Sequence, residues 1–138
     1  MNIYFACSIT GGREYESVYQ AIVAALIEDG HEVPTAHLAE ADVPAREAEI
    51  DPQIVYSRDV NWIRACDMLI AEVSVPSHGV GYEIGLALSL QKRVLALHCD
   101  GRKVSKMISG NPDENLTLLS YQTPEEAISQ LRKNLRRT

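Results

Sequence analysis

Residues 67–85 have the sequence DMLIAEVSVPSHGVGYEIG, and this stretch decides the fold class. Its first part, Asp67–Val73, is almost wholly apolar, which is typical of a central strand of a parallel sheet, buried on both faces. A short loop with a proline and a glycine follows, and Val80–Gln91 then has the small-residue pattern of a tightly packed helix. A buried strand that leads through a loop into a helix is the repeating unit of α/β proteins.

The same alternation extends in both directions from this stretch. Further strands are predicted at Ile3–Ser8, Glu32–His37, Arg93–His98 and Leu116–Tyr121, and further helices at Tyr15–Asp29, Gln53–Ala65, Val104–Ser109 and Pro124–Arg136. The polar segment Glu40–Pro52, with prolines at 44 and 52, is predicted to be a loop. We therefore expect an α/β fold with a five-stranded, parallel, doubly wound sheet, Rossmann-like or flavodoxin-like, in three αβα layers.

Composition restricts the classes of partner. The chain has 138 residues, enough for one domain, and a net charge of -6 with no basic block beyond the tail Arg132–Arg137, so we expect no nucleic-acid partner. No apolar run is long enough to cross a membrane and no signal peptide is visible. The three cysteines are odd in number and lack metal-ligand spacing, which predicts free thiols, a reducing cytoplasmic location and no metal or cofactor.

Ligands of doubly wound sheets bind beyond the carboxyl ends of the strands. The first loop there, Ser8–Arg13, offers hydroxyl groups, paired glycines and an arginine, which favours a phosphate or carboxylate site. A tight turn that requires two glycines explains it equally well. Neither a Walker loop nor a GxGxxG pattern is present, which argues against a nucleoside triphosphate or NAD.

Two carboxylates are candidates for catalysis. Glu83 follows the most buried strand and opens a rigid helix whose dipole favours the ionised form that a nucleophile needs; complementing that dipole is its alternative, purely structural role. Asp59 lies among apolar neighbours, including Trp62, which can raise a carboxyl pKa and produce a general acid. A solvated Asp59 paired with Arg58 or Arg64 is the simpler alternative. Two carboxylates at one cleft are what cleavage of an N- or O-glycosidic bond requires.

Three further side chains could assist this chemistry. Tyr4, on the first strand, could orient Glu83, and His37 could line a pocket for a base. A core tyrosine and a surface histidine are equally plausible, and Trp62 is more typical of a core residue than of a stacking platform.

Four blocks of the sequence resemble the 2′-deoxynucleoside 5′-phosphate N-hydrolase family, which shares its fold and glutamate with the nucleoside 2-deoxyribosyltransferases. The resemblance runs from Ile3 to about Tyr121, and the third block is long and specific. The blocks are Tyr4–Arg13, Asp59–Asp67, Ala71–Gly85 and Gly101–Ile108. The resemblance implies a single domain of the deoxyribosyltransferase type over residues 1–138.

The resemblance also implies residue roles. Glu83 would attack C1′ to form a glycosyl-enzyme, Asp59 would protonate the leaving base and then activate water, and Tyr4 would support Glu83. A small-molecule deoxynucleotide would be the substrate, and a homodimer would share its active sites. The implied substrate-binding residues are Ser8, Ile9, Thr10, Gly11, Gly12, Arg13, Ser77 and Gly79 on the sugar and phosphate side, Val55 and His37 at the base, and Ser105 and Met107 from a neighbouring subunit.

The chain departs from the family pattern at two positions. Thr10 stands where family members usually carry arginine, and a hydroxyl is a weaker phosphate anchor than a guanidinium, so strict dependence on a 5′-phosphate does not follow. Cys7 replaces a glycine and crowds the approach of a sugar. A deoxyribosyltransferase and a nucleotide-binding module without turnover are the alternatives to a hydrolase.

Overall fold

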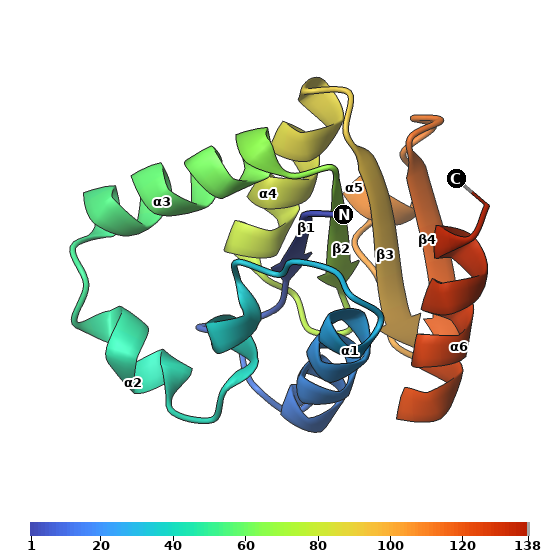
Figure 1. Cartoon of the computed structure of the whole chain (residues 1–138), viewed down its shortest axis with the longest axis horizontal. Coiled ribbons are helices and arrows are strands. Elements are labelled where there is room, and N and C mark those ends of the chain that lie inside the picture. The colour runs from blue at the N-terminus through green and yellow to red at the C-terminus, as the bar shows by residue number, and fades with distance from the viewer. Residues whose placement is uncertain (138) are drawn as a thin grey trace.

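The computed structural model describes residues 1–137, and its strands and helices alternate along the chain (Figure 1). The strands are β1 (Ile3–Ala6), β2 (Met68–Glu72), β3 (Arg93–Cys99) and β4 (Leu116–Tyr121). The helices are α1 (Glu16–Glu28), the 3-10 helix η1 (Ala36–Ala39), α2 (Val43–Ala48), α3 (Pro52–Ala65), α4 (His78–Ser89), α5 (Lys106–Ser109) and α6 (Pro124–Leu135).

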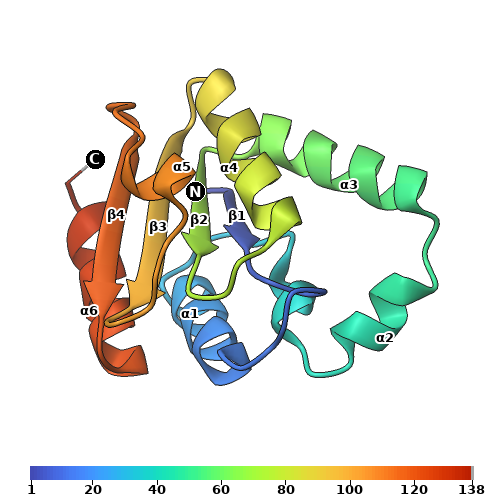
Figure 2. The same cartoon turned by 180° about the vertical axis from the view of Figure 1, so that it is seen from behind.

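All four strands are parallel and lie in the order β1-β2-β3-β4, with Ile3 opposite Met68 and Met68 opposite Arg93. Strand residues alternate between two cores. Ile3 and Phe5 face α1 and α6, whereas Tyr4 and Ala6 face the side covered by α3 and α4. Figures 1 and 2 show these helices on opposite faces of the sheet. The predicted doubly wound α/β architecture is therefore confirmed, with four strands in place of five.

The predicted strand Glu32–His37 is wrong, because pairing along the edge of β1 stops after one bridge between Asn2 and Glu32. Ile3 donates its N–H to the Glu32 carbonyl at 2.8 Å, and the next donor in a parallel ladder would come from residue 34. That residue is proline, which has no N–H. Phe5 instead donates its N–H to the buried hydroxyl of Thr35 at 2.9 Å.

The predicted loop Glu40–Pro52 is wrong in part, because it contains α2. Pro44 lies in the first turn of this helix, where a missing N–H costs no hydrogen bond. Both views show α3 extending beyond the sheet, with α2 joined to its outer end (Figures 1 and 2). Asp51 caps α3 by accepting the N–H of Gln53 at 2.8 Å. Residues of α2, of α3 and of the loop after β1 line one pocket.

The cysteines are free thiols, with Cys7 and Cys66 buried and Cys99 partly exposed. No helix within residues 1–137 is both long enough and apolar enough to cross a membrane.

Candidate active site

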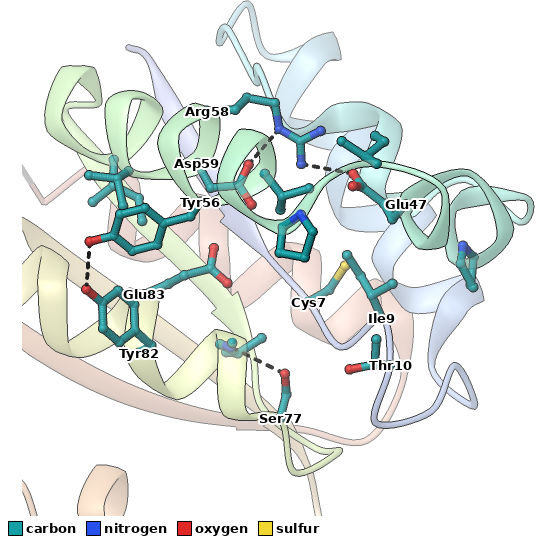
Figure 3. Close-up of a pocket in the computed structure, with 18 of the residues that line it drawn as sticks. Cys7, Ile9, Thr10, Glu47, Tyr56, Arg58, Asp59, Ser77, Tyr82 and Glu83 are labelled. Carbon is teal, nitrogen blue, oxygen red and sulfur yellow. Dashed lines mark hydrogen bonds and ion pairs between the residues drawn. The ribbon is translucent and has the colours of Figure 1, made fainter.

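A pocket of about 550 Å³ lies at the switch point beyond the carboxyl ends of the strands, where β1 leads into α1 on one face of the sheet and β2 leads into α4 on the other (Figure 3). Its wall comes from the loop after β1, from α2 and α3, and from the start of α4. The lining residues are Cys7, Ile9, Thr10, Pro44, Glu47, Ala48, Ile50, Pro52, Val55, Tyr56, Arg58, Asp59, Val60, Ile63, Ser77, Gly79, Val80, Tyr82 and Glu83.

Glu83 and Asp59 both turn their carboxyl groups into this pocket, one from α4 and one from α3 (Figure 3). Glu83 lies in the second turn of α4, because Ser77 caps the helix and accepts the N–H of Val80 at 3.3 Å. The helix thus begins two residues before the predicted start at Val80. The predicted effect of the helix dipole on Glu83 is wrong for this reason, since that effect fades within the first turn.

The pKa of Glu83 is raised to about 7, chiefly because the carboxyl is buried and in smaller part because the charge of Asp59 is nearby. The hydroxyl of Tyr4 and the guanidinium of Arg58 act in the opposite direction, because both favour the ionised carboxylate. At neutral pH the Glu83 carboxyl therefore exists in both forms. A carboxyl group with a pKa near the working pH is suited to catalysis.

Tyr4 lies on β1 beneath Glu83, with its whole side chain buried. Its hydroxyl has no partner at normal hydrogen-bond geometry among residues 1–137, and burial together with the charges of Glu83 and Asp59 raises its pKa. The phenol therefore stays protonated. It favours the ionised form of Glu83 because its O–H can donate a hydrogen bond to the carboxylate.

Asp59 is paired with Arg58, as the simpler prediction had it, and it also lines the pocket. The Nε of Arg58 donates to Oδ1 of Asp59 at 2.8 Å, and the Asp59 side chain keeps 20% of its exposure. Trp62 does not line the pocket; its ring packs under the Arg58 guanidinium, with 5.1 Å between the guanidinium carbon and the ring centroid.

The first predicted loop contributes only part of its residues to the pocket. Ile9 and Thr10 line it, whereas Gly11 and Gly12 form the turn. Ser8 is wholly buried, and its hydroxyl has no hydrogen-bond partner in the described part of the chain. Arg13 turns away from the pocket. Its guanidinium donates to the carbonyl oxygens of Leu38 and Glu40, each at 2.8 Å, and it stabilises backbone there.

The other predicted residues fall into three groups. Val55, Ser77 and Gly79 line the pocket. His37 does not; its ring lies behind the wall, against Trp62 with 5.9 Å between ring centroids. Ser105 and Met107 lie at α5, outside the pocket, where Ser105 accepts the N–H of Met107 at 3.2 Å.

Sequence reasoning missed Glu47, Tyr56, Arg58 and Tyr82 as residues of the pocket. Glu47 comes from α2 and accepts the Arg58 Nη2 at 2.9 Å. The hydroxyl groups of Tyr56 and Tyr82 lie 3.3 Å apart where α3 and α4 meet. The Arg58–Asp59 pair was visible as adjacent opposite charges, but no pattern in the sequence placed Glu47 near them.

No group of three histidine, cysteine or acidic side chains within the described part of the chain is arranged to hold a metal ion. The carboxyl groups of Glu83 and Asp59 and the guanidinium of Arg58 line the pocket. The phenol of Tyr4 lies beside Glu83. Such a set can attack a carbon and protonate a leaving group, which is acid–base and nucleophilic catalysis.

Comparison with known proteins gives a consistent result. Residues 3–127 match the family model described as nucleoside 2-deoxyribosyltransferase. A Methanosarcina mazei protein named as a 2′-deoxynucleoside 5′-phosphate N-hydrolase is 42% identical over 130 residues, covering 94% of this chain and 80% of the relative. The mouse protein named 5-hydroxymethyl-dUMP N-hydrolase is 43% identical over 136 residues, covering 96% of this chain and 78% of the relative.

The fold is also shared with a solved structure. The Clostridium botulinum CMP N-glycosidase BcmB superposes with a TM-score of 0.74 at 22% identity, covering 96% of this chain and 98% of that one. At this level of identity the likeness concerns the fold alone.

Proposed function

The chain belongs to the nucleoside 2-deoxyribosyltransferase family, and we propose that it is an N-glycosidase that hydrolyses 2′-deoxynucleoside 5′-monophosphates to free base and 2-deoxyribose 5-phosphate. The observation that carries the proposal is the convergence of Glu83 and Asp59 in one pocket at the switch point of the sheet. Relatives named as N-hydrolases, 42% and 43% identical over most of the chain, support it.

The reacting form of the site carries one proton, on Asp59, and in the first step the ionised carboxylate of Glu83 attacks C1′ of the sugar. The bond between C1′ and the base nitrogen breaks, its electron pair stays with the base, and Asp59 delivers a proton to the base. The products of this step are the free base and a deoxyribosyl ester of Glu83. Tyr4 donates its O–H to Glu83 and orients the attacking oxygen, a role for which its otherwise unpartnered hydroxyl is suited.

In the second step Asp59, now a carboxylate, removes a proton from water. The resulting hydroxide attacks C1′, the ester bond breaks, and Glu83 leaves as a carboxylate while Asp59 is protonated again. Two displacements at one carbon retain its configuration. The cycle returns both carboxyl groups to their starting states with one water consumed.

The remaining pocket residues divide between the two ends of the substrate. We place the 5′-phosphate near Thr10, Ser77 and Gly79, where the cap of α4 exposes backbone N–H groups; Ser8, Gly11, Gly12 and Arg13 shape this loop from behind. Ile9 meets the 2′-carbon and disfavours a 2′-hydroxyl, and Val55 faces the base. His37 acts on the base end only through Trp62 and Glu47.

A homodimer with shared sites is part of the proposal. Ser105 and Met107 lie on an exposed segment outside the pocket, and the Met107 side chain is 82% exposed, which is unusual for a methionine. We propose that both reach the pocket of a second subunit. The free thiols favour a reducing compartment such as the cytoplasm.

The second candidate is a nucleoside 2-deoxyribosyltransferase, which the family match favours. The two activities differ only in what attacks the deoxyribosyl ester, water or a second base. Incubation of the wild type with the four deoxynucleoside monophosphates and their nucleosides, with and without an added base, separates them by chromatography. Release of free base and deoxyribose phosphate supports the hydrolase, whereas a new nucleoside in the presence of acceptor supports the transferase.

The Glu83→Gln variant tests the catalytic assignment in the same assay, with Glu49→Gln as the control because Glu49 is exposed and does not line the pocket. We expect Glu83→Gln to lose base release and Glu49→Gln to keep it. A wild type that binds nucleotides without releasing base would instead indicate a binding module.

A further inference from the structure

Among residues 1–137, Arg58 is the only arginine or lysine that lines the pocket, and the two-step reaction above gives it no part. We propose that Arg58 is the positioning residue for the acid: it holds Oδ1 of Asp59 so that Oδ2 alone exchanges protons with the leaving base and with water. The inference rests on the proposed function, because it concerns the second carboxyl of that reaction.

The guanidinium of Arg58 is fixed on three sides. Its Nε donates to Asp59 Oδ1 at 2.8 Å, its Nη2 donates to Glu47 Oε1 at 2.9 Å, and its plane packs over the ring of Trp62 at 5.1 Å. The Arg58 side chain keeps 22% of its exposure and Glu47 keeps 11%. Because three contacts from two helices restrain it, Arg58 presents Nε to Asp59 in one place, as a planar guanidinium can and a flexible ammonium cannot.

A ring of four side chains closes behind this contact. Glu47 lies 3.6 Å from the Nε2 of His37, and the His37 ring packs edge-on against Trp62. Trp62 returns to Arg58, so that Glu47, His37 and Trp62 together form the support for the guanidinium. This explains why His37 lies behind the pocket wall: it holds the support in place and has no direct contact with the pocket.

The consequence for Asp59 follows from the geometry. Oδ1 is occupied by Arg58, whereas Oδ2 makes no hydrogen bond within residues 1–137 and belongs to a side chain that lines the pocket. A carboxyl group that is free to rotate presents its proton in many directions, whereas a carboxyl group held by a hydrogen bond presents it in a single direction. Fixing the direction of proton transfer in this way is catalysis by positioning. Arg58 also stabilises the carboxylate that remains on Asp59 once its proton has passed to the base.

The guanidinium acts on Glu83 as well, through charge alone. It lowers the pKa of Glu83, opposing the effects of burial and of Asp59. Replacing Arg58 by a neutral residue therefore raises the pKa of Glu83, and the pH at which the nucleophile ionises moves upward. A residue that served only to fill space would leave that pH unchanged.

The test compares Arg58→Gln, Arg58→Lys and the control Arg64→Gln, which removes an exposed arginine from the same helix outside the pocket. We expect Arg58→Gln to lower kcat by at least about tenfold with KM for the deoxynucleotide changed less than about twofold. The acid limb of its pH profile should move to higher pH. Arg58→Lys keeps the charge but cannot hold two carboxylates in the same geometry, so its kcat should lie between those of the wild type and Arg58→Gln.

Circular dichroism and thermal unfolding of each variant show that folded protein is being compared, and Arg58→Lys carries the test if Arg58→Gln does not fold. A folded Arg58→Gln protein with unchanged kcat and pH profile would overturn the inference. A rise in KM alone would also overturn it, since that result identifies a substrate contact. If the wild type releases no base from any deoxynucleotide, the proposed function itself fails, which is a separate outcome.

Discussion

Gly11 approaches the backbone of Pro76 so closely that a Cβ at position 11 would lie 2.4 Å from the Pro76 carbonyl oxygen and 3.1 Å from Oγ of Ser8. Such a contact is possible only without a side chain. It joins the loop after β1 to the loop that leads from β2 into α4. Thr10 and Ser77, one on each loop, are therefore held at a fixed separation across the pocket.

The substitution Gly11→Ala tests the importance of this contact. The added methyl group meets backbone that cannot yield cheaply, so the two loops must move apart and the free energy of unfolding should fall by about 1–3 kcal/mol. We expect KM for the deoxynucleotide to rise, because both sides of the phosphate position shift. Gly81→Ala is the control: its Cβ meets nothing within 4 Å, and alanine should stabilise α4 by about 0.5–1 kcal/mol. Equal effects of the two substitutions would show that the contact has no special role.

The strand and helix quoted first, Asp67–Val73 and Val80–Gln91, were predictable because a buried parallel strand is apolar throughout and its position in the chain needs no knowledge of partners. The segment Glu32–His37 was a weaker candidate for a strand, because half of its residues are polar and it contains Pro34. It fails as a strand because of one missing donor at Pro34, whose register against Ile3 appears only in the folded sheet. The hydrophobic pattern of a segment shows whether it can be buried as a strand. Only the folded structure shows whether its backbone groups form hydrogen bonds with a neighbouring strand.

The hydroxyl of Thr35 accepts the Phe5 N–H in place of a backbone carbonyl of a neighbouring strand, and this contact should contribute to stability. In Thr35→Val the side chain keeps its shape but loses the oxygen that accepts the Phe5 N–H, and a buried donor without a partner costs about 1–3 kcal/mol. Thr35→Ser keeps the acceptor and should lose less. Urea unfolding of the three proteins measures the difference. If serine and valine destabilised the protein equally, the lost methyl group or the packing would be responsible and the hydrogen bond would not.

The sequence predicted those residues of the site that lie close to a strand end along the chain. Glu83, Ser77 and Gly79 lie directly after the central strand, and the switch-point rule brings them to the carboxyl edge of the sheet. Glu47 belongs to a short helix that the prolines at 44 and 52 disguised as a loop. Its contact with Arg58 joins two helices whose relative position depends on how the segment between them folds, which local patterns do not describe.

Because the pKa of Glu83 is raised, a rise in pH should increase the activity of the protein while it decreases the contribution of Glu83 to stability. The folded-state pKa of about 7 exceeds the ordinary glutamate pKa of 4.5, so the folded protein binds more protons than the unfolded chain between these pH values. The contribution of Glu83 to stability is therefore fully present below about pH 4.5 and is lost as pH rises through 7. Catalysis needs the ionised form, so kcat/KM should rise over the upper part of the same interval.

Glu83→Gln removes this titration, and thermal unfolding reports it. The variant should gain stability relative to the wild type as pH rises from 5 to 8, by an amount on the order of 2 kcal/mol, while losing base release at both pH values. Glu49→Gln, at an exposed position, should show no such pH-dependent gain. A constant difference between Glu83→Gln and the wild type across this range would contradict a carboxyl that titrates near neutrality.

Thr10 offers a test of how the phosphate is held. Arg58 is already paired with two carboxylates, and Arg13 is bound to backbone oxygens, so no unpaired cation lines the pocket within the described chain. We expect the wild type to prefer a deoxynucleotide over its nucleoside only modestly. Thr10→Arg, at an exposed position of the first loop, should increase the ratio of their kcat/KM values about tenfold or more. Thr10→Gln adds length without charge and should leave the ratio near that of the wild type; an equal gain from glutamine would rule out a charge effect.

Met107 provides the sharpest test of a shared site, because its side chain is exposed in one chain and is proposed to complete the pocket of another. Met107→Glu should shift the protein towards a monomer in analytical ultracentrifugation and reduce kcat/KM by at least about tenfold, since a charge at the centre of an apolar interface is strongly unfavourable. Ile27→Glu changes another exposed apolar residue, on α1 at the opposite face of the sheet, and should affect neither property.

Mixing the Glu83→Gln protein with the Met107→Ala protein distinguishes a shared active site from simple dimerisation. In a mixed dimer one site combines the intact Glu83 of one subunit with the intact Met107 of the other, so activity should exceed the sum of the two variants alone. A mixture that gains nothing, or a fully active wild-type monomer, would mean that each chain carries a complete site of its own.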